Sequence, residues 1–219
     1  MQAGVITFPG SNCDRDIAVA LAAAGARVER LWHAESALPR LDLIVLPGGF
    51  TYGDYLRVGA IAARAPAMAE VVRRAAAGVP VLGICNGFQI LAEAGLLPGA
   101  VISNAGLRFI CRPVALEVGT TDAVFTAGYR PGQTVTIPIA HHDGCYVCTE
   151  DDLARLADED RIALRYLDNP NGSIGNVAGV LGPGRNVLGL MPHPERAADP
   201  ITGGTDGLTM LRALVEALG

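Results

Sequence analysis

The chain has 219 residues, of which 50% are hydrophobic and 18% are charged, and its formal net charge is −5. This composition is typical of a globular domain with a substantial core and excludes an intrinsically disordered chain. The acidic balance and the lack of a Lys/Arg cluster argue against nucleic acid and anionic membranes as partners.

Apolar runs such as residues 17–24 are shorter than the ~18 residues of a membrane-spanning helix. The N-terminus starts directly as a strand rather than as a charged leader. Five cysteines, an odd number without the spacing of a disulfide framework, are typical of a reducing cytoplasm. We therefore expect a cytoplasmic protein without a membrane span.

Strand and helix patterns alternate in the first half of the chain. Ser11 or Asn12 is the expected N-cap of the first helix, Gly25 is expected to follow its end, and Pro66 suits the first turn of the next. An all-apolar strand at 43–46 between helices predicts a parallel sheet covered on both faces. The expected strands of this half are residues 5–8, 27–32, 43–46 and 79–84.

The elbow at Cys85 is the most informative stretch of the sequence. A short apolar strand meets a helical pattern with almost no connector, in Gly83-Ile84-Cys85-Asn86-Gly87-Phe88-Gln89. This is the nucleophile-elbow pattern with cysteine in place of serine. The N-terminus of the helix favours a thiolate, and the Asn86 N–H points where an oxyanion would form. The alternative interpretation is a buried cysteine that packs a helix against a sheet.

The pattern changes after Pro98. Strands are expected at 114–118 and 134–139, a short acidic helix at 151–160, and three more strands at 162–167, 176–181 and 187–191. Asn-Pro-Asn-Gly and Gly-Pro-Gly-Arg turns separate the last three strands, which predicts an antiparallel meander. Asp206 is positioned to cap a final helix.

These elements predict one α/β domain spanning residues 1–219, because no repeat, low-complexity segment or linker divides the chain. Its sheet should be doubly wound, open and mostly parallel (flavodoxin-like), with an antiparallel addition in the C-terminal half. Ligands of such sheets bind at the carboxyl ends of the strands.

His193 and Glu195 follow the strand at 187–191 in a proline-stiffened segment. A cysteine nucleophile needs a base, and the base needs an orienting carboxylate or amide. Their two-residue spacing lets both side chains point the same way, so Glu195 could orient His193 toward Cys85. Alternatively, this segment is a surface loop with incidental polar residues.

A second oxyanion donor is expected at Gly49, in Pro47-Gly48-Gly49-Phe50 directly after a strand. Glycine allows a backbone to approach a ligand and turn its N–H inward. The same Gly-Gly pair could be an ordinary turn.

The three motifs around Gly49, Cys85 and His193 together resemble the class I (triad) glutamine amidotransferases. Three further stretches, at residues 8–14, 49–57 and 169–173, resemble the stand-alone glutaminase subunits of phosphoribosylformylglycinamidine synthase in purine biosynthesis. The similarity covers nearly the full length of the chain.

The resemblance implies that Cys85 attacks the side-chain amide of glutamine, that His193 serves as base and protonates the departing ammonia, and that water hydrolyses the thioester. It also implies that the glutamine is held by part of the elbow helix and by the loop at 104–109, with Arg108 as a partner for the carboxylate. The substrate-binding residues implied in this way are Gln89, Asn104, Arg108 and Phe109.

The same resemblance implies partners. Such glutaminases pass ammonia to a synthetase subunit that uses ATP and magnesium, and a small accessory subunit often completes the complex. We expect no cofactor on this chain itself.

The segment at 140–148 departs from the resemblance, which would place a loop like His-Gly-Glu-Gly there. His142, Cys145 and Cys148 could be read as a zinc site, or the two cysteines as a redox pair. Against both, a spacing of three in an extended segment sends Cys145 and Cys148 to opposite faces, and only His141 offers a fourth ligand. We expect no metal.

Cys13 is a rival nucleophile at the first strand-to-helix corner. It lacks flanking glycines and a histidine that the sequence pairs with it, so we interpret it as structural. His33 is expected to be solvated in a polar loop, and Cys111 to lie in the core.

Three other functions are open: a glutaminase for a histidine, pyrimidine or anthranilate pathway; a cysteine-elbow stress or chaperone-like protein of the flavodoxin-like set; and an idle binding module. His193 and Glu195 argue against the last two, which need no base after a late strand.

Overall fold

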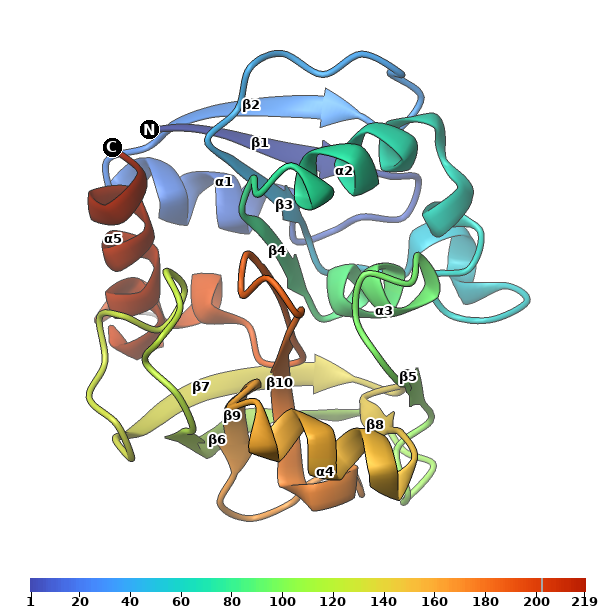
Figure 1. Cartoon of the computed structure of the whole chain (residues 1–219), viewed down its shortest axis with the longest axis vertical. Helices are drawn as coiled ribbons and strands as arrows, with labels where there is room; N and C mark the ends of the chain where they lie inside the picture. The colour runs from blue at the N-terminus through green and yellow to red at the C-terminus, as the bar shows by residue number, and fades with distance from the viewer. Residues whose placement is uncertain (202) are drawn as a thin grey trace.

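A single nine-stranded sheet runs through the computed structural model, which describes residues 1–201 and 203–219 (Figure 1). The sheet is mixed, with strand order β2-β1-β3-β4-β11-β10-β9-β6-β7. Its parallel half consists of β2 (Arg27–Trp32), β1 (Gln2–Thr7), β3 (Leu43–Leu46), β4 (Val81–Ile84) and β11 (Val187–Leu190). Its antiparallel half consists of β10 (Val177–Leu181), β9 (Ile162–Tyr166), β6 (Ile110–Val118) and β7 (Thr134–His141).

The order β2-β1-β3-β4 confirms the predicted flavodoxin-like sheet, and the antiparallel strands confirm the predicted C-terminal addition. Helices α1 and α5 pack against each other, while α2 and α3 lie over the opposite side of the parallel half (Figure 1). These helices are α1 (Asp14–Ala23), α2 (Pro66–Ala76), α3 (Asn86–Glu93) and α5 (Asp206–Leu218). Because both faces are covered, every residue of β3 and β4 is buried.

The start of α1 differs from the prediction. Cys13 is the N-cap residue, and no side chain caps this helix. The Ser11 hydroxyl instead accepts a hydrogen bond from the Phe8 N–H at 3.0 Å, so it closes the turn after β1. The Asn12 side chain accepts from the Cys13 thiol at 3.2 Å. Both proposed N-caps are therefore wrong, because the tight turn uses their side chains first, whereas Gly25 does follow the helix with φ of 104°.

The last strand of the meander determines where the second half of the chain joins the first. Strand β11 pairs with β4 in parallel, with Leu190 opposite Ile84. The two strands therefore end side by side, and the residues that follow them enter the same edge of the sheet. This places the elbow at Cys85 next to the segment Pro192-His193-Pro194-Glu195.

The antiparallel half curls back over that edge. Although β7 is the outermost strand, the Pro138 carbonyl within it accepts a hydrogen bond from the His193 N–H at 2.8 Å. The Cys85 thiol lies 3.8 Å from the Ala140 carbonyl oxygen of the same strand. Strand β7 thus covers the carboxyl ends of β4 and β11.

Several elements were not predicted. A two-stranded sheet of β5 (Ala100–Ile102) and β8 (Cys145–Val147) lies before α4 (Glu150–Asp158), and short 3-10 helices occupy residues 51–54, 62–64, 174–176 and 194–197. Asp206 is not the cap of α5: Thr205 is, and the Asp206 carboxylate accepts from the Thr136 N–H at 2.6 Å. Cys111 is exposed on β6 rather than in the core. No helix in the described part of the chain has the length and apolarity to cross a membrane.

Candidate active site

The elbow holds Cys85 in a strained conformation. Its φ of 50° and ψ of −107° lie outside the regions that non-glycine residues ordinarily adopt. The backbone is fixed there because the Cys85 N–H donates to the Leu190 carbonyl at 2.7 Å and α3 starts at the next residue. A side chain at Gly87 would collide with the Leu46 carbonyl, so only glycine permits this close approach of α3 to β3.

Two backbone N–H groups near Cys85 have no hydrogen-bond acceptor among the described residues. Asn86 is the first residue of α3, and the first N–H groups of a helix have no partner within it. Gly49 faces Ser11 in an isolated bridge whose hydrogen bonds run from Phe50 to Gly10 and from Asn12 to Gly48, on either side of it. These bonds leave the Gly49 N–H unused.

His193 and Glu195 form a buried pair. The distance between His193 Nδ1 and Glu195 Oε1 is 2.6 Å, and the two side chains are 2% and 0% exposed. A bond from Nδ1 leaves Nε2 as the reactive nitrogen of the ring. His193 Nε2 is buried and has no hydrogen-bond partner among the described residues. The predicted orientation of the histidine by the glutamate is thus present in the geometry.

Electrostatics favour a protonated His193. Burial by itself would lower the pKa of the imidazole, but the charges of Glu195 and then Cys85 outweigh it and raise the pKa well above its usual value. An imidazolium beside a cysteine is the partner that a thiolate requires.

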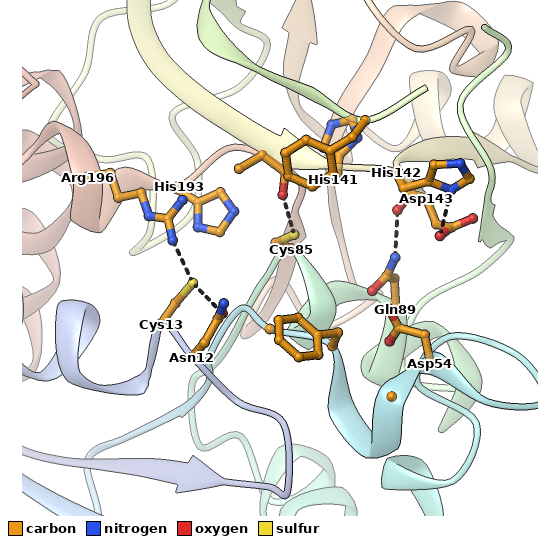
Figure 2. Close-up of a pocket in the computed structure, with 15 residues that line it drawn as sticks. Asn12, Cys13, Asp54, Cys85, Gln89, His141, His142, Asp143, His193 and Arg196 are labelled. Atoms are coloured by element: carbon orange, nitrogen blue, oxygen red, sulfur yellow. Dashed lines mark hydrogen bonds and ion pairs between the residues drawn. The ribbon is translucent and has the colours of Figure 1, made fainter. Parts of the chain in front are cut away.

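Gly49, Cys85 and His193 line a cavity of about 450 Å³. Figure 2 shows Cys85 at the centre of the cavity, below the strand that carries His141. One group of side chains lies on each side of Cys85. One side carries Asn12, Cys13, His193 and Arg196, and the other carries Asp54, Gln89, His142 and Asp143.

Gln89 is held rigidly at the cavity wall. Its side-chain NH₂ donates to the Asp143 carbonyl at 2.6 Å, and its oxygen accepts from the Asn86 side chain at 2.9 Å. Phe109 lines the cavity as well, while 63% of its surface is exposed. The structure therefore brings two of the four substrate residues implied by the resemblance to the cavity.

Asn104 and Arg108 lie elsewhere. Arg108 is exposed and does not line the cavity. Asn104 is fully buried, and its NH₂ donates to the carbonyls of Arg108 and His141 at 2.8 and 2.9 Å. Its oxygen must then face the Gly144 N–H at 3.1 Å and His141 Nδ1 at 2.9 Å. In this arrangement Asn104 orients His141 instead of touching the cavity.

His141, which lines the cavity, consequently has an unprotonated Nε2. Because the Asn104 oxygen accepts, His141 Nδ1 carries the proton and Nε2, which is buried and unpartnered, does not. Burial first, and then the charge of His193, lowers the pKa of His141 to about 4. His141 is therefore a neutral hydrogen-bond acceptor. In the sequence, the only sign of such a role is its position shortly before Asp143 and Gly144.

Cys13 lies closer to the triad than the sequence indicates. Its sulfur accepts a hydrogen bond from the Arg196 guanidinium at 3.0 Å, and a Cβ built on Gly48 would touch both Cys13 Sγ and His193 Cε1. Cys13 is buried, and it has a histidine neighbour, which the sequence did not indicate. The parallel strands β1 and β3 cause this, because the turn after each one packs against the other.

Cys13, His193 and Glu195 also offer three potential metal-ligand atoms within 4.8 Å of one another. Thiolate, imidazole and carboxylate are suitable zinc ligands. However, the 2.6 Å bond between His193 and Glu195 already uses those atoms, and the Arg196 guanidinium would repel a cation from the sulfur. The arrangement fits acid–base chemistry better than metal binding. Cys145 is buried, Cys148 is half-buried, and neither joins His142 in a potential ligand cluster within the described ranges.

His33 differs from its prediction. It packs against the rings of Phe8, Trp32 and Tyr52, and its Nδ1 lies 2.9 Å from the Tyr52 hydroxyl. It is therefore half-buried and anchors the loop after Gly49.

Comparison with known proteins identifies the family. Residues 1–204 match the CobB/CobQ-like glutamine amidotransferase domain. The phosphoribosylformylglycinamidine synthase subunit PurQ of Cereibacter sphaeroides is 59% identical over 219 residues, covering 100% of this chain and 99% of that protein. The PurQ subunit of Rubrobacter xylanophilus is 54% identical over 215 residues, or 98% of each chain.

Solved structures agree. A chain of PurLQS from Thermotoga maritima superposes with a TM-score of 0.93 at 44% identity, covering 100% of this chain and 99% of that one. The glutaminase domain of Trypanosoma brucei CTPS has a TM-score of 0.62 at 16% identity, covers 99% of this chain and 94% of that one, and shares the fold alone. The chain belongs to the glutamine amidotransferase family, among the PurQ subunits of phosphoribosylformylglycinamidine synthase.

Proposed function

We propose that this chain is the glutaminase subunit of phosphoribosylformylglycinamidine synthase, which hydrolyses L-glutamine to glutamate and ammonia and passes the ammonia to a synthetase partner in purine biosynthesis. The observation that carries the proposal is the strained Cys85 elbow beside a buried His193–Glu195 pair, in a chain with full-length identity to such subunits.

In the first half-reaction, His193 already holds the proton that Cys85 has given up, and the Cys85 thiolate attacks the carboxamide carbon of glutamine. The N–H groups of Gly49 and Asn86 stabilise the negative oxygen of the tetrahedral intermediate. His193 then returns the proton to the departing nitrogen, so that ammonia leaves and a glutamyl thioester remains on Cys85.

In the second half-reaction, His193 removes a proton from water, which attacks the thioester carbonyl. The same two N–H groups stabilise the second tetrahedral intermediate. Collapse expels the Cys85 thiolate beside the protonated His193, which restores the starting pair, and glutamate is released. Glu195 holds the imidazole in the correct tautomer and stabilises its charged form in both half-reactions.

The substrate is held around Gln89 and Phe109, which line the cavity. Arg108 could approach the substrate carboxylate only if the exposed residues 105–109 closed over the cavity. Asn104 contributes to the site indirectly, because it orients His141. The single domain spans residues 1–219.

The chain needs no cofactor for these steps, and ATP with magnesium acts on the synthetase partner. A small accessory subunit completes the complex. The similar chain from Thermotoga maritima belongs to a solved structure of PurLQS, which supports an assembly of this kind. The five cysteines, all free, support a cytoplasmic location.

The other functions considered from the sequence receive less support. Proteins of other amidotransferase pathways share only the fold at 16–19% identity, whereas the PurQ subunits compared above are 54–59% identical over nearly the whole chain.

The test is reconstitution. The chain is mixed with a synthetase subunit, the accessory subunit, ATP, magnesium and formylglycinamide ribonucleotide, and product formation is measured with glutamine or with ammonium as nitrogen source. Cys85→Ala should abolish the glutamine-dependent reaction only, while Cys111→Ala, at an exposed cysteine, should leave both unchanged. Glutamine-dependent synthesis by Cys85→Ala, or none by the wild type, would contradict the proposal.

A further inference from the structure

Asp54 has no assigned role, yet its carboxylate lies in the wall of the cavity. It is the last residue of the 3-10 segment Thr51–Asp54, which follows the Gly48–Gly49 turn. Figure 2 places it beside Gln89 and across the cavity from His193. Asp143 lines the same side.

One carboxylate oxygen of Asp54 is unpaired. Oδ1 is buried and has no hydrogen-bond partner among the residues that the structure describes. A buried acceptor without a donor is unfavourable, and the cost is larger for a charged one. Burial first, and then the nearby charge of Asp143, raises the pKa of Asp54 to about 6.

The cationic side chains near Asp54 already contact other groups. Arg57, three residues further on, is bound to the Glu93 carboxylate through hydrogen bonds of 2.6 and 2.5 Å. Arg196, on the opposite side, donates to Cys13. His142 Nδ1 lies 3.2 Å from Asp143 Oδ2 and so faces the second carboxylate. The wall at Asp54 therefore lacks a cation in the described part of the chain.

The substrate of the proposed reaction carries the missing cation. Free glutamine has its reacting carboxamide at one end and an α-ammonium group at the other. When the carboxamide lies at Cys85 and beside the unused N–H groups of Gly49 and Asn86, the opposite end reaches the wall that carries Gln89 and Asp54. An ammonium group offers three donors and a positive charge.

We infer that Asp54 binds the α-ammonium group of glutamine, with Asp143 as the second carboxylate of the subsite. This inference rests on the proposed function. The site thereby selects a free α-amino acid. The α-nitrogen of a glutamine residue inside a peptide is uncharged, so a peptide would leave Asp54 unpaired and unfavourably buried.

The position of Asp54 in the loop supports a specific role. Asp54 has φ of 56°, and its neighbour Tyr52 has φ of 55°, conformations that are strained for non-glycine residues. In this arrangement the loop is held by two contacts, because the Thr51 N–H donates to the Asn86 side chain and the Tyr52 hydroxyl lies 2.9 Å from His33 Nδ1. Both contacts lie just before Gly53, and they hold the segment from which Asp54 reaches the cavity.

The experiment compares two substrates in the assembled complex. L-Glutamine and glutaramate carry the same carboxamide, but glutaramate lacks the α-amino group. We expect Asp54→Asn to lower kcat/KM for glutamine by roughly 10²-fold, the order expected when one partner of a desolvated charge pair is removed. The value for glutaramate should change less than about 2-fold, so that the wild-type preference for glutamine is lost.

Asp122→Asn, at a carboxylate that is 85% exposed, is the matched control and should not alter the preference. Asp54→Ser gives a second neutral variant in case the asparagine variant does not fold. Equal losses for both substrates in a folded variant would overturn the inference and assign Asp54 to loop structure. An unchanged preference would also overturn it. Failure of the proposed function is distinct, because the wild type would then turn over neither substrate.

Discussion

The Asn86 side chain ties the loop that carries Gly49 to the elbow that carries Cys85. Its oxygen accepts a hydrogen bond from the Thr51 N–H at 3.2 Å, and its NH₂ donates to Gln89 at 2.9 Å. Asn86 is fully buried, so these bonds are shielded from water. One side chain therefore sets the spacing between the two proposed oxyanion donors.

We expect Asn86→Ala to impair both stability and turnover. Loss of the side chain leaves the Thr51 N–H and the Gln89 oxygen without partners, which should cost about 1–3 kcal/mol in the free energy of unfolding. The loop is then released, so kcat should fall by at least about 10-fold while KM changes less. Urea unfolding and steady-state kinetics measure the two effects. A stable variant with normal kcat would show that the loop is held by other contacts.

Cys85 rather than Cys13 should be the nucleophile. Cys85→Ala is expected to abolish glutamine hydrolysis and to leave the fold intact, because only Cys85 sits on the elbow beside both proposed oxyanion donors. Cys13→Ala should reduce turnover far less, although it removes the sulfur that Arg196 contacts. Mass spectrometry of the glutamyl thioester locates the adduct. An adduct on Cys13 would reverse the assignment.

Glu195 should act only through His193. Glu195→Gln can still occupy the site but cannot stabilise the imidazolium, so it should slow turnover by a smaller factor than His193→Ala does. The apparent pKa of the activity profile should also fall, because the raised pKa of His193 depends on the Glu195 charge. Equal losses in the two variants, with circular dichroism unchanged, would mean that Glu195 takes a direct part.

The sequence predicted that Cys85 and His193 lie at the same edge of the sheet, because topology determines this placement. Cys85 and His193 each follow an apolar strand, and the carboxyl ends of neighbouring parallel strands meet at one edge. The tight turns at Gly48 and Gly87 could likewise be recognised as places of close backbone approach. The elements around the triad were therefore largely predictable.

The remainder depends on contacts between distant segments. Nothing local indicates that β7 curls over the elbow, so the cavity roof formed by Ala140 and His141 was not foreseen. The alternation around residue 109 suggested that Cys111 faces the core, but Cys111 lies near the start of β6, where the strand is largely exposed. Asn104 and Arg108 share a loop, and only the folded chain shows that the first turns inward and the second outward.

His141 should make the protein sensitive to acid. Its pKa is about 4 in the folded chain, below the ordinary value of 6.5, so between these values the unfolded chain binds more protons. The free energy of unfolding should therefore fall as the pH drops from 6.5 to 4, by up to about 3 kcal/mol.

His141→Gln removes this titration and should flatten the dependence, even if it lowers stability at pH 7. His142→Gln, whose side chain is 49% exposed, is the control and should retain the wild-type slope. Urea unfolding at a series of pH values supplies the comparison. An unchanged slope in His141→Gln would mean that His141 is not buried in its neutral form.

The isolated chain should be a poor glutaminase that its partner activates. The loop after Gly49 contains three non-glycine residues with positive φ, and its side chains Phe50, Tyr55 and Leu56 are 52%, 75% and 91% exposed. Such a loop can exchange between arrangements that turn the Gly49 N–H toward or away from the intermediate. Losing one oxyanion donor typically costs about 10²–10³ in rate, or about 3–4 kcal/mol.

A synthetase that packs on these apolar side chains would bind one loop arrangement more tightly and so recover that rate. Glutamine hydrolysis is measured for the chain alone and after addition of the synthetase with its acceptor and nucleotide. Leu56→Asp should keep the isolated rate but lose most of the activation, because a charge then opposes docking of the loop. Val19→Asp, on the exposed face of α1, is the matched control and should be activated normally. If the isolated chain already works at the rate of the complex, the oxyanion site is preformed and the loop is not a switch.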